Sequence, residues 1–233
     1  MKRSLATHVC LGLFGGLILT GAAFAQGPLQ EKFAEAKQAT ARNKEALRTY
    51  SWLQSMDASY KGEAKKTSVN TCQYGPDGSV QKTLVSTSPP PPQKPGLRGR
   101  IIAKKTAEMK AEVESAAALV LSYVPPSPDL IQAAIAGNNA SLTTAGPGAV
   151  ALVFKNYLKA GDSMTLTFES QIKKLQRVVI STYLDDPKKA VTLQVTMQSL
   201  PDGTNYPAVE VLGLPSSNLV IRIQNSNYHK LGS

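Results

Sequence analysis

Histidine and cysteine are scarce in this chain of 233 residues, which has two of each. The N-terminal segment described below holds His8 and Cys10, so only Cys72 and His229 lie beyond it. A serine or cysteine nucleophile needs a positioned base, commonly histidine, and a zinc site needs several converging ligands. His229 also lies close to the C-terminus, where chains tend to fray. The sequence therefore indicates no catalytic residue, no metal and no cofactor.

Acidic residues are few and dispersed, with 16 Asp and Glu against 26 Lys and Arg. Asp185-Asp186 is the only adjacent acidic pair, and the Pro that follows makes it typical of a solvated hairpin turn rather than of a calcium site. Residues 96–100 hold two glycines before a helix but lack the Lys-Ser/Thr of a phosphate-binding loop. A carboxylate hydrolase would require two acids facing one another in a cleft. We expect a binding protein rather than an enzyme.

The N-terminus has the three parts of a secretory signal peptide. Lys2-Arg3 is basic, residues 9–23 form a short apolar run, and Ala23-Phe24-Ala25 fits the cleavage motif. The apolar run is shorter than the ~18 residues that a membrane span needs, and no later run is long enough. We expect residues 1–25 to be removed and residues 26–233 to form one soluble domain, periplasmic or secreted, with no transmembrane anchor. Because Lys2 and Arg3 are the only charges lost from a chain of net charge +10, the remainder keeps +8.

A helix and three strands are predicted ahead of the Pro-rich segment. Pro28 begins a stretch rich in Ala, Glu and Lys that favours a helix to about residue 48. Residues 49–56 alternate between apolar and polar side chains, as a half-buried strand does. Residues 64–74 and 79–87 form two further strands, separated by the turn sequence Gly75-Pro76-Asp77-Gly78. These three strands should form an antiparallel meander.

A helical insertion follows this meander. Residues 88–96 are a Pro-rich linker, which is extended and semi-rigid. Residues 97–124 then carry apolar side chains at helical spacing, until Pro125-Pro126 ends the helix. A short helix is predicted for residues 128–136, so residues 97–137 form a helical lid. The apolar positions of the long helix are Ile102, Met109, Val113, Ala116, Val120 and Tyr123.

Six strands are predicted after residue 138, separated by turn sequences at short spacing. In Met164-Thr165-Leu166-Thr167-Phe168 one face is apolar and the other is threonine, so one face of the sheet should stay wet. About nine strands in all must curl or close. The predicted fold is therefore α+β, a large curved antiparallel half-barrel whose concave face is covered by the N-terminal helix and the helical insertion. The six strands are residues 150–157, 163–169, 175–184, 190–200, 208–214 and 219–224.

Seven apolar side chains are candidates to line a ligand cavity between the curved sheet and the long helix. The alternative is that they simply fill the core. A curled sheet of this size commonly encloses space for an apolar ligand, which keeps the cavity interpretation open. The seven residues are Trp52, Met56, Met109, Val113, Phe154, Phe168 and Met197.

The start of the long helix is strongly basic, although the helix macrodipole disfavours cations there. A nearby anion would offset this repulsion. These basic residues are therefore candidates to bind a lipid headgroup, an anionic envelope polymer or an acidic protein, whereas nucleic acid is not expected outside the cytoplasm. The alternative is a solvated charged face that only aids solubility. The residues are Arg98, Arg100, Lys104 and Lys105.

The order of elements along the chain is itself informative. A signal peptide, an N-terminal helix, a three-strand meander and a helical insertion precede an antiparallel run with Gly161-Asp162-Ser163-Met164-Thr165-Leu166 and Leu193-Gln194-Val195-Thr196-Met197. This order resembles the periplasmic lipoprotein carrier and receptor superfamily. Residues 50–78 with Leu97-Arg98-Gly99-Arg100 also resemble uncharacterised secreted bacterial proteins. The superfamily resemblance implies a half-barrel, lined by apolar residues and plugged by helices, that shields the acyl chains of lipoproteins; related members bind misassembled envelope proteins or regulate an envelope stress sensor.

Two hypotheses of function are compatible with this sequence. The first is a periplasmic, non-enzymatic binding protein that shields an apolar or acyl-bearing ligand, a lipid or lipoprotein, in the half-barrel. The alternative is an envelope scaffold or sensor module, in which the sheet is fully packed and the basic face and Pro-rich segment bind a protein or anionic polymer. In either case we expect Cys72 to be buried rather than paired with another chain.

Overall fold

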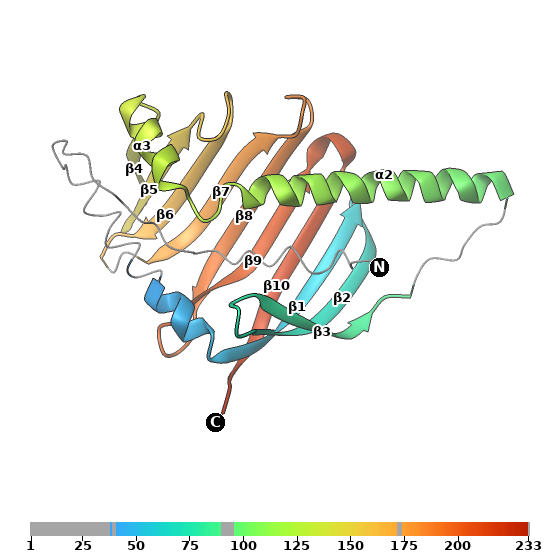
Figure 1. The fold of residues 1–233 in the computed structure, drawn as a ribbon, viewed down its shortest axis with the longest axis horizontal. Helices are drawn as coiled ribbons and strands as arrows, with labels where there is room; N and C mark the ends of the chain where they lie inside the picture. The colour runs from blue at the N-terminus through green and yellow to red at the C-terminus, as the bar shows by residue number, and fades with distance from the viewer. Residues whose placement is uncertain (1–37, 39–40, 90–95, 172–173, 233) are drawn as a thin grey trace.

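The computed structural model describes residues 38, 41–89, 96–171 and 174–232. The expected signal peptide, residues 1–25, lies outside the described residues, and so do residues 90–95 of the Pro-rich linker. The described chain forms one open antiparallel sheet with helices across one of its faces (Figure 1). The α+β half-barrel predicted from the sequence is confirmed.

Ten strands form the sheet, in the order β3-β2-β1-β10-β9-β8-β7-β6-β5-β4. Neighbours in the sheet are neighbours in sequence, except that β1 pairs with β10. The sheet is open because β3 and β4 lie at its two edges. The strands are β1 Tyr50–Tyr60, β2 Glu63–Tyr74, β3 Val80–Thr87, β4 Ala140–Gly146, β5 Ala149–Lys155, β6 Ser163–Glu169, β7 Leu175–Tyr183, β8 Ala190–Ser199, β9 Asn205–Leu214 and β10 Leu219–Lys230.

Strand β4 is the one that the sequence did not predict. Its sequence, ASLTTAG, has no clear apolar alternation, and residues 141–145 are exposed. An edge strand is held by backbone hydrogen bonds to a single neighbour, here β5, so its side chains need not be apolar. Hydrophobic periodicity therefore gives little signal for it.

The helical insertion closely follows its predicted limits, with α2 at Gly96–Leu121 and α3 at Pro128–Ala136. Residues 41–47 are also helical, as expected for the end of the N-terminal helix. A short 3-10 helix, η2, spans Pro215–Ser217 between β9 and β10. Helix α2 crosses the sheet near the turns that join β7 to β8 and β9 to β10, whereas residues 41–47 lie toward the other ends of these strands (Figure 1).

Two adjacent rows of side chains run across seven strands on the concave face, the face that α2 crosses. On the opposite face Thr192, Arg222 and Gln224 are exposed, which confirms the prediction of one wet face. The upper row, nearer α2, consists of Ala58, Ile221, Leu212, Leu193, Ile180, Met164 and Phe154. The lower row consists of Met56, Ile223, Glu210, Val195, Val178, Leu166 and Leu152.

The C-terminal strand extends further than the sequence indicated. The expectation of a frayed tail around His229 is wrong, because β10 continues past this residue and pairs it with Ser51. Aromatic packing holds this end of the strand. The Tyr228 ring stacks on Trp52 with centroids 5.5 Å apart and contacts Tyr206 with centroids 4.4 Å apart.

A buried carboxylate fastens the end of α2 to the sheet. Tyr123, just beyond α2, donates a hydrogen bond to Asp162 Oδ2 at 2.5 Å. Asp162, which lies between β5 and β6, also accepts three backbone N–H bonds from residues 157–159 at 2.5, 3.0 and 2.9 Å. Burial and the bond to Asp162 raise the pKa of Tyr123 above its usual range. The Tyr123 phenol therefore stays protonated and acts as a neutral donor. Both carboxylate oxygens of Asp162 accept hydrogen bonds.

We expect Asp162→Ala to lower the free energy of unfolding by ~3 kcal/mol or more, because several buried donors lose their acceptor at ~1–3 kcal/mol each. Urea denaturation followed by circular dichroism measures the change. Asp185→Ala is the matched control, because Asp185 is exposed and its ion pair is with Lys189 of the same turn. This control should keep the wild-type midpoint, and an Asp162→Ala midpoint equal to wild type would contradict the prediction.

Candidate ligand-binding face

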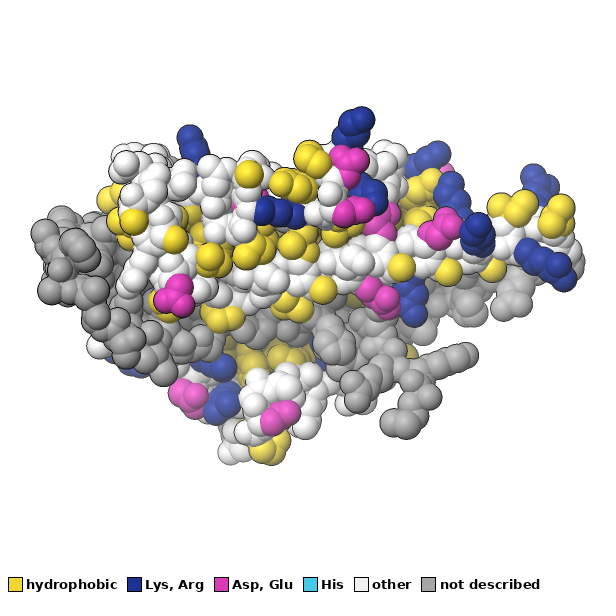
Figure 2. Space-filling view, turned by 45° about the horizontal axis from the view of Figure 1, so that its top comes forward, with side chains coloured by type: hydrophobic (Ala, Val, Ile, Leu, Met, Phe, Trp, Pro, Cys, Tyr) yellow, Lys and Arg dark blue, Asp and Glu magenta, His cyan; other side chains and the backbone are white. Residues whose placement is uncertain are grey.

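The described helices pack on separate parts of the concave face. Helix α2 packs on it with buried residues between positions 116 and 120, and α3 contacts β4 and β5. Residues 41–47 are fastened to the start of β9, where Asn43 and the backbone of Asn205 exchange hydrogen bonds of 2.5 and 2.6 Å. Figure 2 shows hydrophobic side chains in the hollow below α2. The central part of the two rows therefore lies between helices that cross the sheet at different levels.

Six of the seven predicted cavity residues lie in or against one hydrophobic cluster on the concave face. Phe154 and Met197 are buried members of that cluster. The other four are partly buried, so each keeps some exposed surface next to the cluster. They are Met56 and Phe168 from the sheet and Met109 and Val113 from α2.

Trp52, the seventh, packs in an aromatic group at the lower end of β1. Its ring centroid is 5.4 Å from that of Tyr74 and 5.5 Å from that of Tyr228. Its indole N–H donates a hydrogen bond to Asn225 Oδ1 at 3.1 Å. Trp52 therefore lies outside the apolar cluster that holds the other six. It packs in an aromatic group and donates a hydrogen bond to a buried polar side chain.

Polar side chains from four strands form a hydrogen-bonded chain beside Trp52. Lys82 Nζ donates to Gln54 Oε1 at 2.7 Å, and Gln54 Nε2 donates to Asn225 Oδ1 at 2.9 Å. Asn225 Nδ2 donates to the Pro207 carbonyl at 2.8 Å and lies 3.4 Å from Glu210 Oε1. We call Lys82, Gln54, Asn225 and Glu210 the polar cluster. It is placed by β3, β1, β10 and β9, next to the buried polar residues Asn70 and Ser68 of β2 and at the border of the apolar part of the face.

Glu210 is the charged member of the lower row and is only 2% exposed. The register places it between Ile223 of β10 and Val195 of β8. Among the described residues, its Oε2 atom has no hydrogen-bond partner. Burial raises the pKa of Glu210 to about 7, against the opposing effects of the Lys82 charge and the hydrogen bond from Asn225. This carboxyl can therefore exist in both protonation states near neutral pH.

A small cavity of about 10 Å³ adjoins Glu210. Its walls include the aromatic rings of Trp52, Tyr74 and Tyr228, and Leu47 from the helical residues 41–47. A cavity needs roughly 10–15 Å³ to hold one water molecule. The space beside the carboxyl thus matches one small polar group.

The polar cluster was not predicted, although the sequence carries a signal for part of it. In Ala208-Val209-Glu210-Val211-Leu212 the alternation places Glu210 on the same side as Ala208 and Leu212, which is unusual for a charge. Gln54 and Asn225 carry no comparable signal. They are 171 residues apart in the chain and meet only because β1 pairs with β10.

The four basic residues predicted to bind an anion are all exposed on the first half of α2. This half of α2 extends beyond the strands in Figure 1. Lys104 lies 4.0 Å from Glu108 in an exposed ion pair, and the Lys105 ammonium lies 5.9 Å from the centroid of the Tyr60 ring. The structure keeps this basic stretch together but separates it from the polar cluster, which lies on the sheet. Three apolar side chains of the same stretch are exposed as well: Leu97, Ile101 and Ile102.

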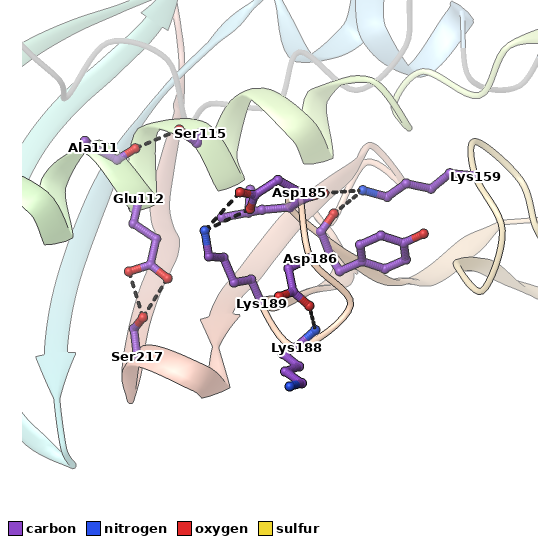
Figure 3. Close-up of polar contacts among 11 residues, drawn as sticks. Ala111, Glu112, Ser115, Lys159, Asp185, Asp186, Lys188, Lys189 and Ser217 are labelled. Atoms are coloured by element: carbon purple, nitrogen blue, oxygen red, sulfur yellow. Dashed lines mark hydrogen bonds and ion pairs between the residues drawn. The ribbon is translucent and has the colours of Figure 1, made fainter.

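An open groove of about 830 Å³ lies between α2, the β7–β8 turn and η2. Figure 3 shows that its charged groups are used internally. The Ser217 hydroxyl donates to the Glu112 carboxylate, whose oxygens lie 2.6 and 2.7 Å away, and Lys189 donates to Asp185 at 2.9 Å. Asp186 accepts a backbone N–H within the turn, which confirms the hairpin-turn interpretation of the acidic pair. The contact between Glu112 and Ser217 fastens α2 to η2 at one wall of this groove.

Three further observations concern the part of the chain that the structure describes. No group of three or more His, Cys, Asp or Glu there could hold a metal ion. None of the helices in these ranges has both the length and the apolar character needed to cross a membrane. Cys72 is fully buried, as expected.

Comparisons with known proteins give distant structural likenesses. No family model and no curated protein matches the chain. A DUF1329 family protein from Desulfovibrio piger is 9% identical with a TM-score of 0.41, and the match covers 88% of this chain and 94% of that one. A LolA superfamily protein from Nitrosomonas europaea is 9% identical with a TM-score of 0.32, and the match covers 84% of this chain and 93% of that one.

The raised pKa of Glu210 predicts that the protein becomes less stable as the pH rises towards and past neutrality. Between the ordinary value of 4.5 and the folded value of about 7, the folded state binds more protons than the unfolded state. The free energy of unfolding should therefore fall as pH rises through this window, by on the order of 3 kcal/mol. Urea midpoints at pH 5 and pH 8 measure the change. Glu210→Gln, which is neutral at both pH values, should remove this part of the dependence, whereas Glu169→Gln on the opposite face should keep it. Identical pH dependence in wild type and Glu210→Gln would contradict the prediction.

Proposed function

We propose that this protein is a non-enzymatic binding protein that shields an apolar or acyl-bearing ligand, such as a lipid or lipoprotein, on its concave face. The observation that carries the proposal is the pair of rows that cross seven strands with Glu210 as their one charged residue. Curved sheets use such faces to hold apolar ligands. The leader-like residues 1–25 support a periplasmic or secreted location.

Burial of the ligand supplies the binding free energy. Each methylene that leaves water contributes ~0.8 kcal/mol, or about 25 cal/mol per Å². We assign the contact with the ligand to the partly buried members of the hydrophobic cluster, with Phe154 and Met197 behind them and Trp52 at the polar end. Methionine suits this role because its flexible thioether adapts to ligands of different shape. The contact residues are Met56 and Phe168 on the sheet and Met109 and Val113 on α2, the lid.

The environments of the buried acids support binding rather than catalysis. Asp162 and Glu210 are the two acids buried in the described chain. Asp162 is saturated by Tyr123 and by backbone N–H groups between β5 and β6. Glu210 lies on β9 among apolar neighbours and the amide of Asn225. Acid and base catalysis by two carboxyl groups needs them on either side of one bond, and these two have separate surroundings.

The exposed first half of α2 supports a second binding activity, contact with an anionic membrane surface. Residues 96–107 contain four cations and no acid, and α2 has no acidic residue in its first turn. Exposed Leu97, Ile101 and Ile102 lie among these cations. A basic helix with exposed apolar side chains is typical of binding at the surface of anionic bilayers. The same surface would serve the alternative module function, in which an acidic protein or an anionic polymer takes the place of the membrane.

We expect Phe168→Lys to abolish lipid co-purification with the exported, processed protein, because a charged ammonium cannot be buried against an acyl chain without a large penalty. Native mass spectrometry and organic extraction measure the bound lipid. Thr167→Lys is the matched control, since this neighbour in β6 points to the opposite face. It should keep its lipid. A wild-type protein that carries no lipid and takes up none from vesicles would show the proposal to be wrong.

Reversing the four basic residues of α2 to Glu should weaken binding to anionic vesicles by at least ~100-fold, because each cation near such a surface contributes ~1 kcal/mol. Co-sedimentation with phosphatidylglycerol and with phosphatidylcholine vesicles, at low and high salt, measures this effect. A control variant with the same net charge reverses four exposed cations elsewhere and should bind almost as wild type. Equal losses in the two variants would mean that overall charge, and not α2, attracts the surface. The control residues are Lys155, Arg177, Lys188 and Arg222.

A further inference from the structure

In the described chain, Glu210 has an unused hydrogen-bond acceptor at the border between the polar cluster and the apolar part of the lower row. Among the described residues no donor reaches Oε2, and the side chain is almost completely buried. Natural interiors seldom leave a buried acceptor without a partner, since the free energy lost is comparable to that of a broken hydrogen bond. The position is central to the lower row, because Ile223 and Val195 flank it on both sides.

The hydrogen bonds of the surrounding donors end on atoms other than Glu210 Oε2. Asn225 Oδ1 accepts from the Trp52 indole and from Gln54, and Asn225 Nδ2 donates to a backbone carbonyl at 2.8 Å. The Lys82 ammonium donates to Gln54 at 2.7 Å. The polar cluster therefore holds its shape through its own hydrogen bonds, and Glu210 Oε2 stays open next to the small cavity.

We propose that Glu210 is a ligand-recognition residue whose Oε2 atom accepts a hydrogen bond from an N–H or O–H group of the bound ligand. The inference rests on the proposed function and narrows the ligand class. The ligand is an acyl compound with an amide N–H or a hydroxyl at its polar end, rather than a hydrocarbon or a fully esterified lipid. Val195, Val178 and Leu166 continue the lower row from Glu210 as a buried apolar strip on the same face.

The cavity beside Glu210 limits the size of the donor group. Its volume of about 10 Å³ is close to that needed by a single water molecule. An amide N–H or a hydroxyl fits such a space, whereas a trimethylammonium group does not. Trp52, Tyr74 and Tyr228 wall the cavity, so the hydrogen bond would form away from water, where such bonds are strong.

Two ligands that differ in their donor test this inference. Dodecanamide and methyl dodecanoate have the same acyl chain and a carbonyl, but only the amide has N–H donors. Their dissociation constants are measured at pH 8 by displacement of the apolar fluorophore N-phenyl-1-naphthylamine from the processed protein. Wild type should bind the amide roughly 10-fold or more tightly than the ester, as expected for a hydrogen bond to a charged acceptor. Glu210→Leu should lose this preference without losing affinity for the ester.

A matched control and a second variant keep the test decisive. Glu169→Leu removes a carboxylate from the opposite face of the sheet and should keep the preference for the amide. If Glu210→Leu does not fold, Glu210→Met has a similar length, has no strong acceptor and should lose the preference in the same way. Retention of the preference in a folded Glu210 variant would overturn the inference.

The outcomes also separate this inference from the proposed function. Equal binding of amide and ester by wild type would overturn the role of Glu210 and leave the apolar binding face intact. Failure of the fluorophore and of both ligands to bind would overturn the proposed function together with the inference.

Discussion

The pairing of β1 with β10 is the contact on which the rest of the structure depends. It joins the N-terminal meander to the C-terminal run of strands, and so makes one ten-stranded sheet from two antiparallel groups. Both rows of the concave face pass through this pair, at Ala58–Ile221 and at Met56–Ile223. A sheet of this width curls and presents a broad apolar surface, which the helices and the proposed ligand cover.

The polar cluster lowers the stability that this face could otherwise provide. An apolar side chain at position 210 would complete the lower row, whereas Glu210 brings a buried carboxyl with a pKa of about 7. Lys82, Gln54 and Asn225 offset part of that cost by ordering the surroundings, yet one oxygen of Glu210 has no partner in the described chain. Perturbed, incompletely satisfied acids of this kind concentrate at functional sites. In the proposed function, the cluster would add a specific polar contact to a surface that otherwise selects ligands by apolar area.

The two halves of helix α2 differ in burial and in charge. Ala116, Ala117 and Val120 in its second half are buried, and the bond between Tyr123 and Asp162 fastens the chain just beyond it. Its first half is exposed and basic, although the helix macrodipole disfavours cations there. Because one end is anchored, the exposed half holds a defined position relative to the concave face. The proposed ligand-binding face and the proposed anion-binding surface would therefore lie in a fixed arrangement to each other.

Local patterns in the sequence determined the elements. Apolar alternation together with turn sequences identified nine of the ten strands, and helical spacing identified α2, because side-chain periodicity reports which face of an element is buried. Strand β4 was not predicted, because an edge strand needs no apolar face. Only the tertiary structure decided that α2 is half packed and that Trp52, Gln54, Asn225 and Glu210 form one buried site. That site depends on the register between β1 and β10, which brings together side chains 171 residues apart, and no pattern within a single segment encodes such a register.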